Sequence, residues 1–344
     1  MFTQRFRPSK FSEIIGQDLP KELLRAIVKN PDSSPKSIIL QGDYGVGKTS
    51  SSKIFAKALN CRRLTKDFDL CGECDVCKSN IENTIYYNEY DSAMIGNVEN
   101  IKELQNTFYF DKSLGYKVIC FDEFHLASVQ AQSSLLKLIE DSNDNIFYIF
   151  CTTNSDKILS TIQSRSLKLN FNLISTEQLR MSLEQISSNE SIDISPESLN
   201  LIVERSNGHA RDAIMLLDEF KLLGEDKFKD YLQSAKSLYI KLFLVSNQGN
   251  FDLVTKIINR LLNFPLYILK QDYEETVLEI IKVGLGVKQT TDKYLTLLLS
   301  LYRNRIFILI DILNDNKIYD MFTSDKRFQS AMYIISKKLS NKIN

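Results

Sequence analysis

The segment that decides the fold is SIILQGDYGVGKT, residues 37–49. Its first five residues form an apolar run typical of a buried strand, and the helical stretch 51–59 follows it. Between them lies G-x-x-x-x-G-K-[ST], in the strand, loop and helix context that this motif requires. The alternative is a chance glycine turn before a helix, which leaves the flanking strand unexplained. We therefore predict a phosphate-binding loop over Gly42–Thr49.

This phosphate loop predicts binding of ATP. Glycines allow backbone N–H groups to turn inward around phosphate oxygens, and the helix N-terminus adds positive potential. Lys48 is expected to reach the β and γ phosphates, and the Thr49 hydroxyl to ligate Mg²⁺. The residues expected to contact the nucleotide are Gly42, Asp43, Tyr44, Gly45, Val46, Gly47, Lys48, Thr49 and Ser50.

A second apolar strand, predicted over 117–123, ends in two acids. Asp122 is expected to hold the Mg²⁺ shell, and Glu123 to activate the attacking water as a general base. Taken alone, an apolar strand with a solvated acidic end is an equally good interpretation; the intact phosphate loop favours the catalytic one. His125 and His209 have no metal-ligand spacing, and we interpret both as surface or loop residues rather than catalysts.

Further strands are predicted over 84–91 and 146–153, with amphipathic helices between the strands. This alternation predicts a parallel sheet covered on both faces, with ligands beyond the carboxyl ends of the strands. From Ser175 onward the pattern is helical, and Ser175 and Ser195 are expected to cap two helices. We predict an α/β domain at 1–172, a helical domain at 173–235 and a helical bundle at 236–344.

Four cysteines with the spacing C-x9-C-x2-C-x2-C lie within residues 61–77. Four thiolates can close a tetrahedral Zn²⁺ site without an open position, which predicts a structural zinc module. The alternative is a redox pair with two unrelated thiols. Cys120 and Cys151 fall in core strands and are expected to be small buried hydrophobes. The predicted zinc ligands are Cys61, Cys71, Cys74 and Cys77.

The composition excludes disordered and fibrous classes, with 43% hydrophobic and 25% charged residues, 12 Gly and 6 Pro. The 43 basic side chains equal the 43 acidic ones. Binding to DNA would therefore need a local patch or a surface built by several subunits. No secretory signal opens the chain, and no apolar run reaches the ~20 residues of a membrane span. We expect a cytoplasmic protein without a membrane partner.

Several ordered motifs together resemble a known family. The chain opens with R-P-x-x-F-x-x-I-I-G-Q over 7–17, and the phosphate loop, the four-cysteine insertion, 97–104 and D-E-F-H at 122–125 follow in order. Over roughly residues 1–220 this resembles the γ/τ ATPase subunits of bacterial DNA polymerase III clamp loaders, in the AAA+ superfamily. The resemblance implies an AAA+ P-loop domain with a zinc-binding insertion, a helical lid domain and a C-terminal helical collar domain.

The resemblance also implies residue roles. It places sensor 1 at Thr153, with Asn154 as a neighbouring possibility, and sensor 2 at Arg211. Arg165, in S-R-S at 164–166, matches the arginine finger that acts in trans on ATP held by the adjacent subunit. Without the resemblance, both arginines would be interpreted as solvated surface charges. The opening motif places Arg7 and Pro8 beside the nucleotide.

As a function, the resemblance implies an ATPase that uses ATP, Mg²⁺ and Zn²⁺ and drives a sliding-clamp loader. Its partners would be the other subunits of a ring, expected to be pentameric, the sliding clamp and primer-template DNA. Alternatives are a helicase loader, a helicase, a nucleotide kinase, or a non-hydrolysing scaffold subunit of the same assembly. The chain end at residue 344 is expected to mark a short, γ-like form. Frequent Asn, Ile and Lys indicate a low-GC bacterium or a phage, and hence bacterial or host cytoplasm.

Overall fold

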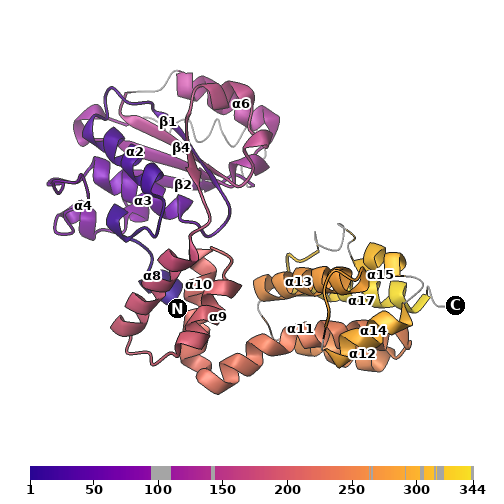
Figure 1. Cartoon of the computed structure of the whole chain (residues 1–344). Coiled ribbons are helices and arrows are strands. Elements are labelled where there is room, and N and C mark those ends of the chain that lie inside the picture. The colour runs from indigo at the N-terminus through magenta and orange to yellow at the C-terminus, as the bar shows by residue number, and fades with distance from the viewer. Residues whose placement is uncertain are drawn as a thin grey trace. The chain divides into compact units, whose positions relative to one another are not determined.

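The chain folds into two compact units, Met1–Leu222 and Leu223–Asn344 (Figure 1). The computed structural model describes residues 1–93, 110–140, 144–262, 264, 266–290, 292–302, 306–313, 315 and 321–341. The motif segment 97–104 lies outside these residues. Each unit has a hydrophobic core of its own.

The first unit contains a five-stranded parallel sheet with the strand order β2-β3-β4-β1-β5. The four predicted strands are confirmed, although β2 begins at Tyr87 rather than at residue 84. The fifth strand was not predicted, because its alternating sequence LKLNF resembles a surface segment more than a buried strand. It pairs with β1, buries Leu169 and Phe171, and leaves Lys168 and Asn170 exposed. The strands are β1 (Ser37–Gly42), β2 (Tyr87–Asp91), β3 (Lys117–Asp122), β4 (Ile146–Thr152) and β5 (Leu167–Phe171).

Helices cover both faces of the sheet, as Figure 1 shows for α2 and α3 on one side and α6 on the other. Because side chains alternate along a strand, each central strand supplies both cores. On β1, Ile38 and Leu40 pack in the core beneath α2 (Asp18–Lys29) and α3 (Lys48–Leu59). Ile39 points the other way, into the core beneath α6 (Val129–Glu140) and α7 (Ser160–Ser164).

Three helices follow the sheet within the first unit. They are α8 (Thr176–Asn189), α9 (Pro196–Arg205) and α10 (Ala210–Leu223). The Ser175 hydroxyl accepts a hydrogen bond from the backbone N–H of Gln178, and the Ser195 hydroxyl accepts one from Ser198, so both predicted caps are confirmed. Shorter elements are α1 (Phe2–Arg5), η1 (Phe11–Glu13), α4 (Asp75–Lys78), η2 (Ile81–Asn83), η4 (Lys112–Leu114), η5 (Phe124–Leu126) and η6 (Ser155–Lys157).

The second unit is helical in the residues that the structure describes. Its core includes the ring contact between Tyr239 and Tyr273, whose centroids lie 5.5 Å apart. The predicted boundary at residue 235 falls inside α11, which is one continuous helix. The helices are α11 (Glu225–Asn247), α12 (Phe251–Leu261), α13 (Leu266–Gly284), α14 (Lys293–Leu301), α15 (Ile306–Leu313) and α17 (Asp325–Asn341). Across the described ranges, none of the helices combines the length and apolarity that a bilayer span requires.

Candidate functional site

The predicted phosphate loop joins the end of β1 to the start of α3. Gly45 and Gly47 have φ angles of +68° and +102°, in the left-handed region that favours glycine. A side chain at Gly42 would lie 2.3 Å from the carbonyl oxygen of Phe171 on β5. The first and last glycines of the motif and Gly45 are therefore required by local geometry.

The two polar side chains that end the motif make different contacts. The Lys48 ammonium donates to the carbonyl oxygens of Gly42 and Asp43, at 2.9 and 2.7 Å. The Thr49 hydroxyl donates to Asp122 Oδ2 at 3.2 Å. The structure thus brings together the three residues expected to surround a triphosphate and its Mg²⁺.

Glu123 lies directly beyond β3, next to Asp122. Its φ angle of +47° is uncommon for a residue with a side chain, and such angles concentrate at functional sites. Burial raises the pKa of the Glu123 carboxyl, and the charge of Asp122 raises it further. A carboxyl with a raised pKa is a better proton acceptor from water than a fully solvated one.

The end of β4 contacts His125, which follows this acidic pair, through a residue that the sequence did not single out. Thr153 follows the strand and is exposed. Thr152 is buried, and its Oγ1 lies 3.3 Å from His125 Nδ1. Asn154 accepts a hydrogen bond from the backbone of Asp156 at the start of η6. Of these three residues, Thr152 is the one whose side chain contacts the D-E-F-H segment.

The start of α10 packs against the tip of the phosphate loop. The ring of Tyr44 stacks on His209 with centroids 4.2 Å apart, and the Tyr44 hydroxyl donates to Asp212 at 3.1 Å. Arg211 is exposed, and its Cβ lies 3.2 Å from the position of a Cβ built on Gly45. The predicted sensor-2 residue therefore lies beside the loop.

His209 lies in the loop between α9 and α10, as interpreted, but neither histidine is an exposed surface residue. His209 is 7% exposed and is held by Tyr44, whose carbonyl oxygen lies 2.9 Å from its Nδ1. His125 belongs to η5, and its side chain is 13% exposed. The sequence weakly indicated that each histidine lies near the site, since His125 follows Glu123 by two residues and His209 precedes Arg211 by two.

The opening motif contributes to the same site. Arg7 Nε donates to the Ser50 hydroxyl at 3.3 Å, and Pro8 beside it is half-buried. The Gln17 amide donates to the carbonyl of Asn172 at 2.6 Å and accepts from its N–H at 3.0 Å. These contacts join the N-terminal segment to α3 and to the segment after β5.

Arg165 lies at the C-terminal end of α7 and is exposed. Its Nη1 donates to the carbonyl oxygen of Thr161 at 3.2 Å. The Ser166 hydroxyl lies 2.6 Å from that of Ser37, at the start of β1. The neighbouring serine thus anchors the segment to the sheet, whereas the guanidinium is presented at the surface.

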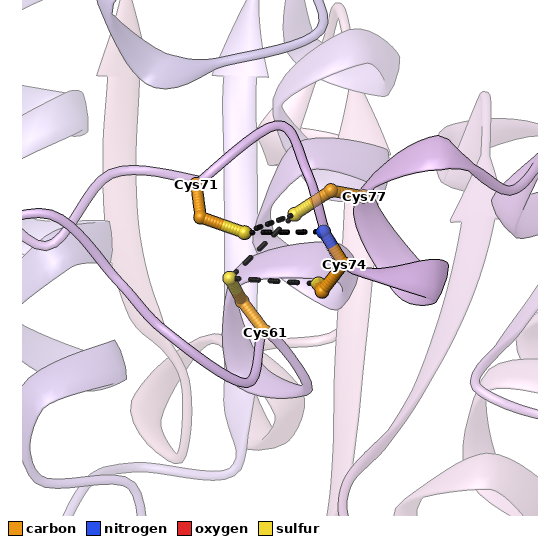
Figure 2. A group of neighbouring side chains, drawn as sticks. All are labelled: Cys61, Cys71, Cys74 and Cys77. Carbon is orange, nitrogen blue, oxygen red and sulfur yellow. Dashed lines mark hydrogen bonds between the residues drawn. The ribbon is translucent and has the colours of Figure 1, made fainter.

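The four clustered cysteines converge on one point, as Figure 2 shows. Their sulfurs all lie within 4.8 Å of one another. The Cys71–Cys77, Cys61–Cys74 and Cys61–Cys77 separations are 3.7, 4.0 and 3.5 Å. A tetrahedron with Zn–S bonds of about 2.3 Å has edges of about 3.8 Å. The donor set and its spacing therefore fit a four-thiolate Zn²⁺ site.

The thiols of this cluster ionise unequally. Partial burial would raise the pKa of Cys74, but backbone N–H groups of Arg62 and Cys77 and the neighbouring thiols outweigh it, and the pKa falls to about 6. Burial and the neighbouring thiols raise the pKa of Cys77. Cys120 and Cys151, by contrast, are fully buried, as predicted, with their sulfurs 3.8 Å apart.

The cysteine module is attached to the rest of the first unit by polar contacts of Cys77 and Asp69. Lys57 of α3 donates to the carbonyl oxygen of Cys77 at 3.0 Å. The buried Asp69 carboxylate accepts hydrogen bonds from the backbone N–H groups of Phe11 and Ser12, at 3.0 and 2.9 Å, and pairs with Arg25 at 3.2 Å. The module is therefore a packed part of the unit.

In comparisons with known proteins, the chain is similar to subunits of DNA polymerase III. Residues 16–175 match the family described as "DNA polymerase III, delta subunit". The chain is 32% identical to DNA polymerase III subunit gamma/tau of Mycoplasma genitalium, over 92% of this chain and 55% of that protein. It is 34% identical to DNA polymerase III subunit tau of Bacillus subtilis, over 62% of this chain and 38% of that protein. The chain thus spans about half or less of these relatives' lengths.

Solved structures confirm the fold. RuvB of Thermotoga maritima, a Holliday junction branch migration motor, superposes with a TM-score of 0.52 over 84% of this chain and 87% of that one, at 18% identity. The parallel-sheet α/β architecture therefore resembles that of RuvB. In sequence, the chain is similar to the gamma/tau subunits of DNA polymerase III, at 32–34% identity.

Proposed function

We propose that this chain is the ATP-hydrolysing motor subunit of a DNA polymerase sliding-clamp loader. The observation that carries the proposal is the hydrogen bond from Thr49 to Asp122, because it joins the phosphate loop to the acidic end of β3. The kinship with gamma/tau subunits supplies the biological context. A P-loop kinase or a helicase shares the first element but not this kinship.

In the proposed reaction, backbone N–H groups of the glycine loop and the Lys48 ammonium bind the β and γ phosphates. Thr49 and Asp122 are the residues that would hold Mg²⁺, which neutralises charge on the phosphates when bound. Glu123 accepts a proton from the attacking water, and its raised pKa suits that task.

We assign to two arginines the neutralisation of the remaining negative charge on the transferred phosphoryl group. Arg211, beside the loop, is the candidate sensor 2 of the same subunit. Arg165 is exposed at the end of α7, a position that suits a guanidinium offered to the nucleotide of an adjacent subunit. Thr153 was expected as sensor 1; the contact of Thr152 with His125 favours Thr152 instead.

The proposed assembly is a ring, expected to be pentameric, of this chain and sister subunits that opens a sliding clamp and places it on primer-template DNA. Because the chain has no net charge, its proposed DNA contacts are individually weak and are summed around the ring. We assign helices α8, α9 and α10 to a lid domain and the second unit, which begins at Leu223, to a collar domain. The site of action would be the bacterial cytoplasm, or the host cytoplasm for a phage-encoded chain.

The cysteine module is proposed to hold one structural Zn²⁺. All four positions of a tetrahedron are supplied by the protein, so no position remains for a substrate. Binding of the ion would favour the thiolate form of all four cysteines. It would also hold together the segment between α3 and β2 that contains them. Its contribution is therefore to stability and shape, and not to the chemical step.

The decisive experiment separates binding, hydrolysis and loading. ATP affinity is measured with a fluorescent analogue, and hydrolysis and clamp deposition on primed DNA are measured with the full chain and its sister subunits. We expect Lys48→Ala to lose ATP affinity, and Glu123→Gln to bind ATP but turn over at least about a hundredfold more slowly. Hydrolysis without clamp deposition would leave an ATPase but refute the loader assignment. Normal turnover by Glu123→Gln would refute the catalytic assignment.

A further inference from the structure

The D-E-F-H segment contains a side chain to which the proposed reaction assigns no part. His125 Nδ1 lies 3.4 Å from Glu123 Oε2 and 3.3 Å from Thr152 Oγ1. One ring nitrogen therefore lies between the proposed general base at the end of β3 and the hydroxyl at the end of β4. Both neighbours are held firmly, since Thr152 is fully buried and Glu123 has a constrained left-handed backbone.

The hydrogen bonds of Thr152 decide which atoms carry protons here. Its hydroxyl oxygen accepts from the backbone N–H of Asn154 at 3.0 Å and lies 3.0 Å from the carbonyl oxygen of the same residue. That carbonyl can only accept, so the single hydroxyl proton is directed to it. The ionised carboxylate of Glu123 can also only accept. His125 Nδ1 faces two acceptors and must therefore carry a proton itself.

We propose that His125 is a positioning residue for Glu123, donating from Nδ1 to the carboxylate and to the Thr152 hydroxyl. This inference rests on the proposed role of Glu123 in ATP hydrolysis. The ring links the orientation of the base to the end of β4, so a change at that strand end is transmitted to the catalytic carboxylate. The remaining nitrogen, Nε2, is not needed for this function.

The backbone of Glu123 explains why such a link is needed. Its φ of +47° places it in a sparsely populated region, and its carbonyl accepts from the N–H of Leu126 at 2.9 Å in the turn that follows. The turn fixes the backbone, but the carboxylate still has three rotatable bonds. The donor on His125, two residues further along the chain, selects one rotamer of the Glu123 side chain. A misplacement of the carboxylate by about 1 Å can lower the rate about a hundredfold.

Substitutions at residue 125 test the proposal because they remove the hydrogen-bond donor or change its position. An Asn amide can occupy the place of Nδ1, whereas a Gln amide reaches only the place of Nε2. We expect His125→Ala and His125→Gln to lower kcat for ATP by about ten- to a hundredfold, with KM and analogue affinity within about twofold of the unsubstituted chain. We expect His125→Asn to recover most of the lost kcat. Thermal unfolding of all three variants identifies any folding defect.

A spectroscopic measurement gives a result that is independent of activity. The chain has two histidines, so the ring nitrogens can be assigned in long-range ¹H–¹⁵N spectra by comparison with His125→Asn. We expect a protonated Nδ1 for His125, and a shifted signal in Thr152→Val. An unprotonated Nδ1, or His125→Asn as slow as His125→Ala, overturns the proposal. Glu123→Gln serves as the reference: if it hydrolyses ATP normally, the proposed function itself has failed.

Discussion

The Thr49 hydroxyl and the Asp122 carboxylate lie 3.2 Å apart, although Thr49 lies in the first turn of α3, after β1, and Asp122 ends β3, which β4 separates from β1 in the sheet. The contact therefore crosses the carboxyl edge of the sheet above the middle strand. A metal ion that replaced this hydrogen bond would be held from two strand ends at once. Its affinity should depend on both side chains together.

A substitution at Thr49 tests this arrangement. Thr49→Val keeps the volume but removes the hydroxyl, and we expect it to raise the Mg²⁺ concentration needed for half-maximal hydrolysis and to lower kcat at least about tenfold. Thr49→Ser keeps the hydroxyl and should stay close to the unsubstituted chain. Titration of Mg²⁺ at saturating ATP measures both. Equal Mg²⁺ dependence in the two variants would contradict the assignment.

Tyr44 should couple the loop to the helical part that follows the sheet. Tyr44→Ala removes both the stack on His209 and the hydrogen bond to Asp212, and we expect weaker ATP binding because Arg211 loses its fixed place beside the loop. Tyr44→Phe removes only the hydrogen bond and should cost about 1 kcal/mol of stability with little change in affinity. Calorimetric titration and thermal melts check the two effects. Identical affinities in Tyr44→Ala and the unsubstituted chain would exclude the coupling.

The cysteine cluster predicts one zinc ion per chain. Metal analysis of the purified protein should give about one equivalent of Zn²⁺, which Cys74→Ser with Cys77→Ser should abolish together with part of the stability. Cys120→Ala is the matched control, because it removes a thiol outside the cluster and should keep the metal. A stable, metal-free protein would show that the four thiols serve another purpose.

Asp69 should make the stability of the first unit depend on pH. Burial alone would raise the pKa of its carboxyl, but hydrogen bonds from the backbone N–H groups of Ser12, Leu70 and Phe11 outweigh it and hold the pKa below its ordinary value. A group whose pKa is lower in the folded state stabilises the fold above its unfolded pKa, and this stabilisation is lost as pH falls through the folded value.

We therefore expect Asp69→Asn to lower the free energy of unfolding at pH 7 by about 1–3 kcal/mol. The difference between Asp69→Asn and the unsubstituted chain should shrink when denaturant melts are repeated at pH values below 4, the range in which an ordinary aspartate protonates. An exposed carboxylate, Asp67→Asn, is the control and should show no such trend. A constant difference across pH would rule out the charge of Asp69 as the cause.

Arg165 should act only between subunits. We expect Arg165→Ala to keep the ATP affinity of the isolated chain and to lose most DNA-stimulated hydrolysis in the assembled complex, by about a thousandfold for a true finger. Arg165→Lys keeps the charge without the planar fork and should recover little. Mixing Arg165→Ala subunits with Lys48→Ala subunits tests the direction of action. Full activity of Arg165→Ala complexes would remove this residue from the mechanism.

Much of the site could be predicted from the sequence, because its motifs are contiguous. The glycine loop, the acidic pair and the cysteine spacing each encode a local geometry that short segments determine. The roles of Thr152 and His125 could not be predicted, since they depend on how two strand ends register side by side. Their contact becomes visible only when β3 and β4 are paired.

The same reasoning applies to the fold. The three central strands β1, β3 and β4 were predicted because burial on both faces gives them continuous apolar runs. The edge strand β5 alternates instead, and its partner β1 lies far away in the sequence. The helix α11 runs through the predicted boundary at residue 235, because polar composition alone does not interrupt a helix.

The chain carries thiols of two accessibility classes, since Cys120 and Cys151 are sealed between strands whereas the cysteines of the cluster are half-buried. A maleimide dye, which reacts with accessible thiols, can therefore report which part of the fold has opened. Chelation would release the outer sulfurs to the dye, and the inner pair would react only once the sheet itself has opened. Labelling stoichiometry after each treatment would then distinguish loss of the module from collapse of the catalytic core.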